Sequence, residues 1–113
     1  MGTLNESRCE ACRPDAPKLA DDELEAVLLQ LPDWKLIDVD GVKQFQREFS
    51  FSDFRKALAF LNTVAELAEE EDHHPSMLLE WAKVTVTWWT HKVQGVHRND
   101  AIMAAKTDAA YHS

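Results

Sequence analysis

The sequence has no long apolar run and little positive charge. No stretch approaches the roughly 20 consecutive apolar residues that span a membrane, and residues 1–20 show no apolar core of the kind found in secretion signals. The 12 Lys and Arg residues stand against 20 Asp and Glu residues, a net charge of −8. Duplex binding needs a basic surface instead. We therefore expect a cytoplasmic protein that neither enters a membrane nor binds nucleic acid directly.

Motifs for nucleotide and structural-metal binding are also missing from the sequence. There is no Gly-rich phosphate loop, no dinucleotide fingerprint and no nucleophile elbow. The two cysteines, Cys9 and Cys12, form a single C-x-x-C without a second pair or a strand-to-helix context. In the cytoplasm they are expected to be reduced thiols. Residues 1–20 lack apolar periodicity, and we interpret them as a flexible tail before one domain, 21–113.

The apolar fraction of 45% in 113 residues is that of one globular domain. Apolar spacing and turn residues predict helices over 21–31, 52–71 and 100–110, and strands over 34–39, 42–51, 77–79 and 83–91. Asp40-Gly41 is a strong signal for a two-residue hairpin turn. The order α-β-β-α-β-β-α predicts an α+β fold, a four-stranded antiparallel sheet with about three helices packed on one face.

Some single positions follow from this pattern. Ser52 is the expected N-cap of the second helix. Trp88 falls on the apolar side of the fourth strand and is expected in the core, whereas His91 is expected at the end of that strand. His97 and His112 have the sequence context of surface residues.

Three histidines are candidates for proton transfer. His73 and His74 follow the acidic run 69–72 at the end of a helix, and His91 ends a strand. Catalytic groups often gather at such ends, and histidine exchanges protons near neutral pH. The alternatives are a solvated helix terminus, a hydrogen-bonded strand end, or a zinc site that includes Asp100. The spacing lacks the H-x-x-x-H pattern typical of zinc sites.

Residues 71–105 resemble the pterin-4a-carbinolamine dehydratases, which recycle the pterin of aromatic amino acid hydroxylases. The positions that match are His73-His74-Pro75, Lys83-Val84-Thr85-Val86-Thr87-Trp88, Thr90-His91, Gly95 and Asp100. Asp33-Trp34 and the start of the second helix also fit, so that the resemblance covers about residues 20–110. The Cys tail and the Trp88-Trp89 pair are similar to the bacterial branch found alongside phenylalanine hydroxylase.

This resemblance implies a hydro-lyase without a cofactor. Its substrate would be 4a-hydroxytetrahydropterin, which would be dehydrated to quinonoid dihydropterin by histidine general acid–base catalysis. No metal is implied. Carried over by position, His73 and His91 would transfer protons and His74 would bind substrate with a share in catalysis. Asp100, Trp34 and Glu69 would bind or orient the substrate or a histidine.

A second hypothesis is a protein-binding module, non-catalytic or in addition to the enzyme. It would modulate the hydroxylase or its expression, and phenylalanine hydroxylase would be its candidate partner. The acidic charge permits a protein partner. The resemblance also implies a homodimer or a homotetramer, although the sequence does not fix the number of subunits.

Overall fold

The computed structural model describes residues 18–112. Most of the predicted tail, including Cys9 and Cys12, lies outside the described residues. The elements, in chain order, are α1 (Asp21–Gln30), β1 (Lys35–Val39), β2 (Val42–Ser50), α2 (Phe54–Glu71), β3 (Ser76–Glu80), β4 (Lys83–Trp88), the 3-10 helix η2 (His91–Val93) and α3 (Arg98–Tyr111). This order confirms the predicted α+β fold. Within the described part, no helix has the length and apolar character to cross a membrane.

The four strands form one antiparallel sheet in the order β1-β2-β4-β3. The hairpin between β1 and β2 turns at Asp40 and Gly41, whose φ angles of 53° and 84° are both positive, as the predicted turn requires. In the centre of the sheet, Phe45 of β2 faces Trp88 of β4. Strands β1 and β3 are the two edges of the sheet.

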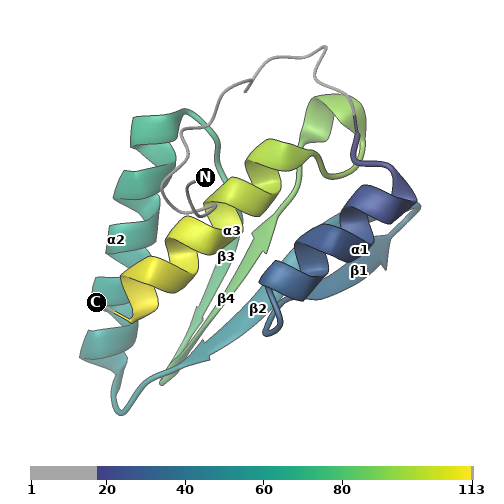
Figure 1. Ribbon diagram of the computed structural model, residues 1–113. Helices are drawn as coiled ribbons and strands as arrows, with labels where there is room; N and C mark the ends of the chain where they lie inside the picture. The colour runs from purple at the N-terminus through teal and green to yellow at the C-terminus, as the bar shows by residue number, and fades with distance from the viewer. Residues whose placement is uncertain (1–17, 113) are drawn as a thin grey trace.

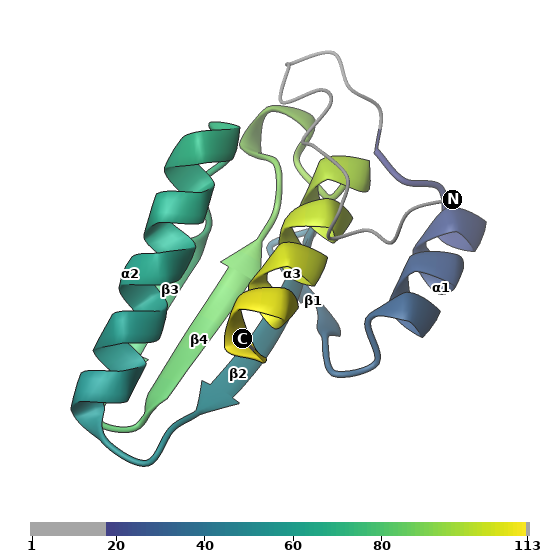
Figure 2. The ribbon, with the colours of Figure 1, turned by 60° about the vertical axis from the view of Figure 1, so that its left-hand side comes forward.

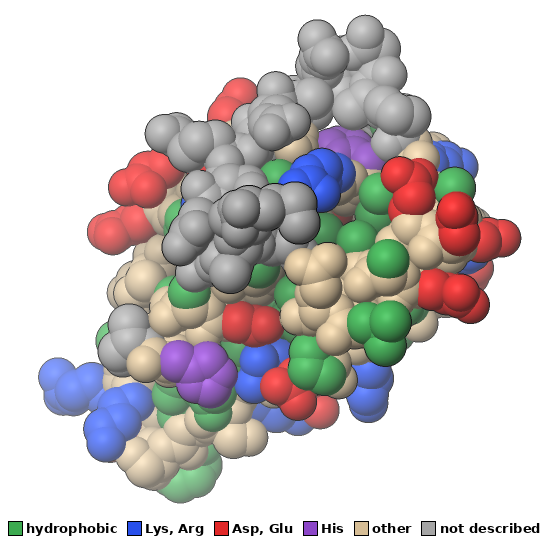
Figure 3. Space-filling view, viewed as in Figure 1, with side chains coloured by type: hydrophobic (Ala, Val, Ile, Leu, Met, Phe, Trp, Pro, Cys, Tyr) green, Lys and Arg blue, Asp and Glu red, His purple; other side chains and the backbone are tan. Residues whose placement is uncertain are grey.

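All three helices lie against the same face of the sheet (Figures 1 and 2). α2 covers β3 and β4, while α3 crosses the middle of the sheet beside β2 and β4. α1 lies over the β1 side (Figure 1). Its first turn consists of Asp21, Asp22 and Glu23, acids that suit the positive end of a helix, and Figure 3 shows acidic side chains gathered there.

The core lies between the sheet and α2 and α3. Phe45, Phe49 and Trp88 are fully buried, which confirms the predicted inward position of Trp88. Each such side chain contributes roughly 1.5–3 kcal/mol through removal of apolar surface from water. Four successive residues of α3 are also fully buried: Ala101, Ile102, Met103 and Ala104. The N-terminal half of α3 is therefore surrounded by protein, and polar side chains there need partners inside the molecule.

Two sequence predictions about element ends were wrong. The N-cap of α2 is Asp53, whose Oδ1 accepts from the Lys56 N–H at 2.8 Å, and not Ser52. Strand β4 ends at Trp88, before His91. Thr90 and Gly95 instead form an isolated bridge, which folds the chain back on itself and leaves His91 as the first residue of η2.

Candidate functional site

His73 points into the protein because of the way in which α2 ends. Asp72 adopts the left-handed conformation at φ 51°, and its N–H donates to carbonyls in the last turn of α2. The His73 N–H donates to the Ala68 carbonyl at 3.1 Å. The His73 ring is 8% exposed and stacks on Trp88, with 5.7 Å between ring centroids and 6° between planes. The helix end and the core together fix this imidazole.

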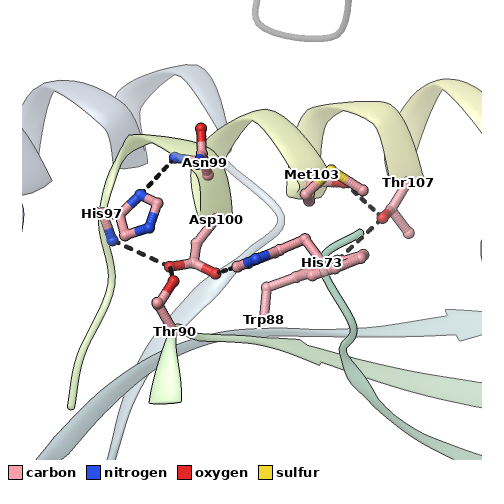
Figure 4. A network of polar contacts seen from close by, with 8 residues as sticks. All are labelled: His73, Trp88, Thr90, His97, Asn99, Asp100, Met103 and Thr107. Atoms are coloured by element: carbon pink, nitrogen blue, oxygen red, sulfur yellow. Dashed lines mark hydrogen bonds and ion pairs between the residues drawn. The ribbon is translucent and has the colours of Figure 1, made fainter. Parts of the chain in front are cut away.

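Asp100, in the first turn of α3, is the polar partner of His73. Its side chain is fully buried, and Oδ1 lies 2.6 Å from His73 Nε2. Oδ2 accepts from the Thr90 hydroxyl at 2.8 Å and from the His97 backbone N–H at 3.0 Å (Figure 4). A carboxylate can be buried only where such donors replace water. Residues from three separate segments therefore meet at one carboxyl group.

The contact with Asp100 occupies one ring nitrogen of His73 and leaves the other one for proton exchange. In the tautomer that makes His73 the donor, Nε2 gives its hydrogen bond to Asp100 Oδ1. In the neutral ring, Nδ1 is then the nitrogen that is able to take up a proton. Thr107 of α3 holds the Trp88 ring in place, because its hydroxyl accepts from Trp88 Nε1 at 3.1 Å (Figure 4).

His97 belongs to the same cluster, and its predicted surface position was wrong. It is 3% exposed and is the N-cap of α3, where its Nδ1 accepts from the Asn99 N–H at 3.0 Å. Its ring centroid lies 6.1 Å from that of His73. Burial lowers the pKa of His97 below its usual value, although the charge of Asp100 opposes this shift. The sequence signal that would have located His97 is the acid three residues later, since the pair forms a capping box.

His74 and Glu69 form a second pair at the surface. His74 Nε2 lies 2.6 Å from Glu69 Oε1, and the two side chains are 56% and 78% exposed. Glu69 also lines a groove of about 500 Å³ along α2, together with Asn62, Ala65, Glu66 and Glu70. The structure thus brings together two of the predicted site residues, His74 and Glu69, and leaves both of them exposed to solvent.

His91 and Trp34 lie apart from both pairs. His91 is exposed, and its ring lies 4.6 Å from that of Trp89. Trp34 is buried, and its Nε1 donates to Asp108 Oδ1 at 2.8 Å. Over residues 18–112, no hydrogen bond, ion pair or ring contact joins either residue to the His73 cluster. The structure therefore brings His73 and Asp100 together but not the full predicted set.

Asp108, the partner of Trp34, is the centre of a separate polar cluster at the other end of α3. It also binds Arg47 at 2.7 Å, and burial raises its pKa above the usual value, against the effect of the Trp34 and Arg47 donors. Arg47 lies over the Phe49 ring at 4.5 Å. These contacts connect β2, α3 and the segment before β1, and we therefore assign this cluster a role in stability.

A metal centre and a second cavity are two further possibilities for a site in the described part. Over residues 18–112, no three His, Cys, Asp or Glu side chains lie together as metal ligands would. A cavity of about 200 Å³ near the start of α1 contains none of the predicted site residues. Its lining residues are Lys18, Leu19, Asp21, Leu24, Gly41, Lys43, Gln94, Gly95 and Val96. The candidate site is therefore the His73 cluster.

Comparison with known proteins identifies the family. The family model of pterin 4 alpha carbinolamine dehydratase matches residues 17–110. The chain belongs to this family. It is also similar to the crystal structure of a transcriptional coactivator/pterin dehydratase from Brucella melitensis, with 36% identity and a TM-score of 0.76 over 83% of this chain and 98% of that one.

A second solved structure shares the fold. It is a pterin dehydratase-like protein described as a RuBisCO assembly factor in the alpha-carboxysome. The identity is 23% and the TM-score 0.61, over 72% of this chain and 92% of that one. The pterin dehydratase fold therefore occurs in proteins described by quite different roles, and the fold alone does not determine the chemistry of this chain.

Proposed function

We propose that the protein is a hydro-lyase that dehydrates 4a-hydroxytetrahydropterin to quinonoid dihydropterin. The observation that carries this proposal is the buried hydrogen bond of 2.6 Å between His73 and Asp100, in a chain that belongs to the pterin dehydratase family. An imidazole that is held by a carboxylate and stacked on a tryptophan is fixed in orientation. Such a group suits general acid–base catalysis, which typically contributes ~10²–10⁴-fold in rate.

The reaction needs one proton added and one removed. The hydroxyl group on C4a leaves with a proton as water, N5 loses its proton, and a double bond forms between C4a and N5. Hydroxide is a poor leaving group, so an acid must protonate it, and a base must receive the proton of N5. No electron is transferred, and the pterin is the substrate. The proposed chemistry therefore uses side chains without a cofactor.

In this proposal, His73 and His91 transfer the two protons. The Asp100 contact supports the role of His73, because it holds the imidazole ring in one orientation. The exposed ring of His91 is open to solvent for proton exchange. His74 binds the substrate with a share in catalysis, and Glu69 orients His74 through their 2.6 Å contact. The buried position of Trp34 favours an orienting role for it over direct contact with pterin.

The test follows the decay of freshly generated 4a-hydroxytetrahydropterin by ultraviolet absorbance. We expect faster decay with the wild-type protein, and a loss of ~10²-fold or more in His73→Ala and in the double variant with His91→Ala. His112→Ala is the matched control, since His112 is exposed at the far end of α3. No acceleration by the folded wild type, or full activity in the double variant, would refute the proposal.

A second candidate function is protein binding, in addition to catalysis. Edge strand β3 exposes Leu78 to 57%, and Trp81 in the turn after it is 71% exposed. Large apolar side chains at a sheet edge are typical of contact surfaces, and the Brucella relative is described as a coactivator as well as a dehydratase. We propose phenylalanine hydroxylase as partner, and a cytoplasmic homodimer or homotetramer as the form that binds it.

A pull-down with phenylalanine hydroxylase tests this second function. We expect capture by the wild type, and reduced capture by Trp81→Ala with unchanged dehydratase activity. Light scattering on the eluted protein gives the number of subunits. An empty pull-down at micromolar concentrations of both proteins would contradict the binding function and leave the enzyme proposal intact.

A further inference from the structure

His97 is a buried histidine that the proposed reaction does not use. Its Nδ1 accepts from the Asn99 N–H, so a neutral ring carries its own proton on Nε2. That Nε2 is buried and has no hydrogen-bond partner in the part of the chain that the structure describes. A buried donor without an acceptor is unfavourable. A serine would cap the helix without leaving such a donor, which indicates that the imidazole does more than cap.

The first turn of α3 connects His97 to the proposed active site. While His97 Nδ1 accepts from Asn99, the His97 backbone N–H donates to Asp100 Oδ2 at 3.0 Å. The other oxygen of Asp100 holds His73. These reciprocal contacts close the turn and aim the carboxylate. The position of His73 therefore depends on the acceptor that His97 supplies.

Protonation of His97 would remove that acceptor. In the imidazolium both ring nitrogens are donors, and Nδ1 then faces the Asn99 N–H as a second donor. The new positive charge would also lie at the helix N-terminus, where the dipole disfavours cations. Two titratable groups act on His97: Asp100 in its own turn favours the charge, and His73 from the segment after α2 opposes it. Burial opposes it as well.

We propose that His97 is a positioning residue for His73 and Asp100: its neutral ring keeps the first turn of α3 closed, and its protonation opens that turn. The consequence for catalysis rests on the proposed function, but the opening of the turn does not. The protein would then lose its active geometry when the pH falls far enough below the usual pKa of histidine for His97 to take up a proton.

The experiment compares wild type, His97→Ser, His97→Ala and the control His112→Ser. Serine keeps a cap but cannot titrate, and alanine removes the cap. We expect log kcat/KM of the wild type to fall more steeply in acid than that of His97→Ser, by about one unit of slope, because one titrating group has been removed. His97→Ala should lose activity about threefold or more at pH 7.5, as expected for a weakened cap. His112→Ser should follow the wild type.

A second readout does not depend on activity. The backbone amide resonance of Asn99 in ¹⁵N-labelled protein should shift between pH 7.5 and 5 in the wild type and in His112→Ser, but not in His97→Ser. Superimposable pH profiles of wild type and His97→Ser, or an Asn99 amide that does not respond to pH, would overturn the inference. If the wild type has no dehydratase activity, the proposed function fails, and the Asn99 amide alone decides the role of His97.

Discussion

Two histidines that are adjacent in the sequence each contact a carboxylate, but one pair is buried and the other is exposed to solvent. His73 with Asp100 and His74 with Glu69 have the same contact distance, 2.6 Å. The first pair is 8% and 0% exposed, whereas the second is 56% and 78% exposed. An exposed pair contributes about 0–1 kcal/mol, while breaking a buried one costs about 3–5 kcal/mol. Two pairs with the same contact distance therefore differ in their contribution to stability, because one is exposed to solvent and the other is not.

The end of α2 creates this difference. The left-handed residue Asp72 turns the chain, so that His73 faces the core and His74 faces water. Pro75 follows and disfavours a return to helix. The chain thus presents one imidazole with a fixed orientation and a second one that is free to adapt. This division suits a rigid proton-transfer group next to an adaptable binding group.

Neutralising each carboxylate in turn should produce the largest difference between the two pairs. Asp100→Asn keeps the shape, but its amide nitrogen is a donor and cannot accept the hydrogen bonds that the carboxylate accepts, so that His73 loses its fixed orientation. We therefore expect kcat to fall by about 100-fold or more. Glu69→Gln should stay within about twofold, because solvent replaces the lost contact. The carbinolamine decay assay measures both variants. Equal losses in the two variants would show that burial does not separate the pairs.

The same contrast should appear in stability. Asp100→Ala leaves the Thr90 hydroxyl, the His97 N–H and His73 without their acceptor, and we expect a loss of roughly 3 kcal/mol in the free energy of unfolding. Glu69→Ala should change it by less than about 0.5 kcal/mol. Urea unfolding at pH 7.5 gives both values, and unchanged m-values show that the two-state comparison holds. A loss below about 1 kcal/mol in Asp100→Ala would contradict the prediction.

The sequence predicted the elements better than the cluster that they position. Alternation and helical spacing located all four strands and three helices, because those periods reflect burial directly. The contact of His73 with Asp100 joins residues 27 positions apart and has no local signal, so that only the family resemblance suggested that Asp100 orients a histidine. His97 was misplaced because a polar residue before a helix is usually exposed. His91 was misplaced because the Thr90–Gly95 bridge ends the alternation early.

Buried His97 should make the free energy of unfolding depend on pH. Because burial lowers the pKa of His97 below 6.5, the unfolded chain binds more protons than the folded one in mild acid. The contribution of His97 is complete above pH 6.5 and is lost as the pH falls below it. We expect the wild type to lose more of its free energy of unfolding than His97→Ser as the pH is lowered from 7.5 to below 6.5 in urea unfolding. A curve for His97→Ser that runs parallel to that of the wild type would contradict the assignment.

Salt gives the smallest expected effect and the cleanest contrast between the pairs. At 1 M NaCl the Debye length is about 3 Å, so exposed charges are screened while buried ones are not. The small stability difference between wild type and Glu69→Ala, a few tenths of a kcal/mol at low salt, should vanish. The difference for Asp100→Ala should persist, because no ion reaches a carboxylate that is fully buried between His73, Thr90 and the start of α3. Urea unfolding at 0.05 M and 1 M NaCl measures both differences. A salt-sensitive Asp100→Ala difference would mean that water and ions enter the cluster, and His73 would then have to be regarded as a surface histidine like its neighbour.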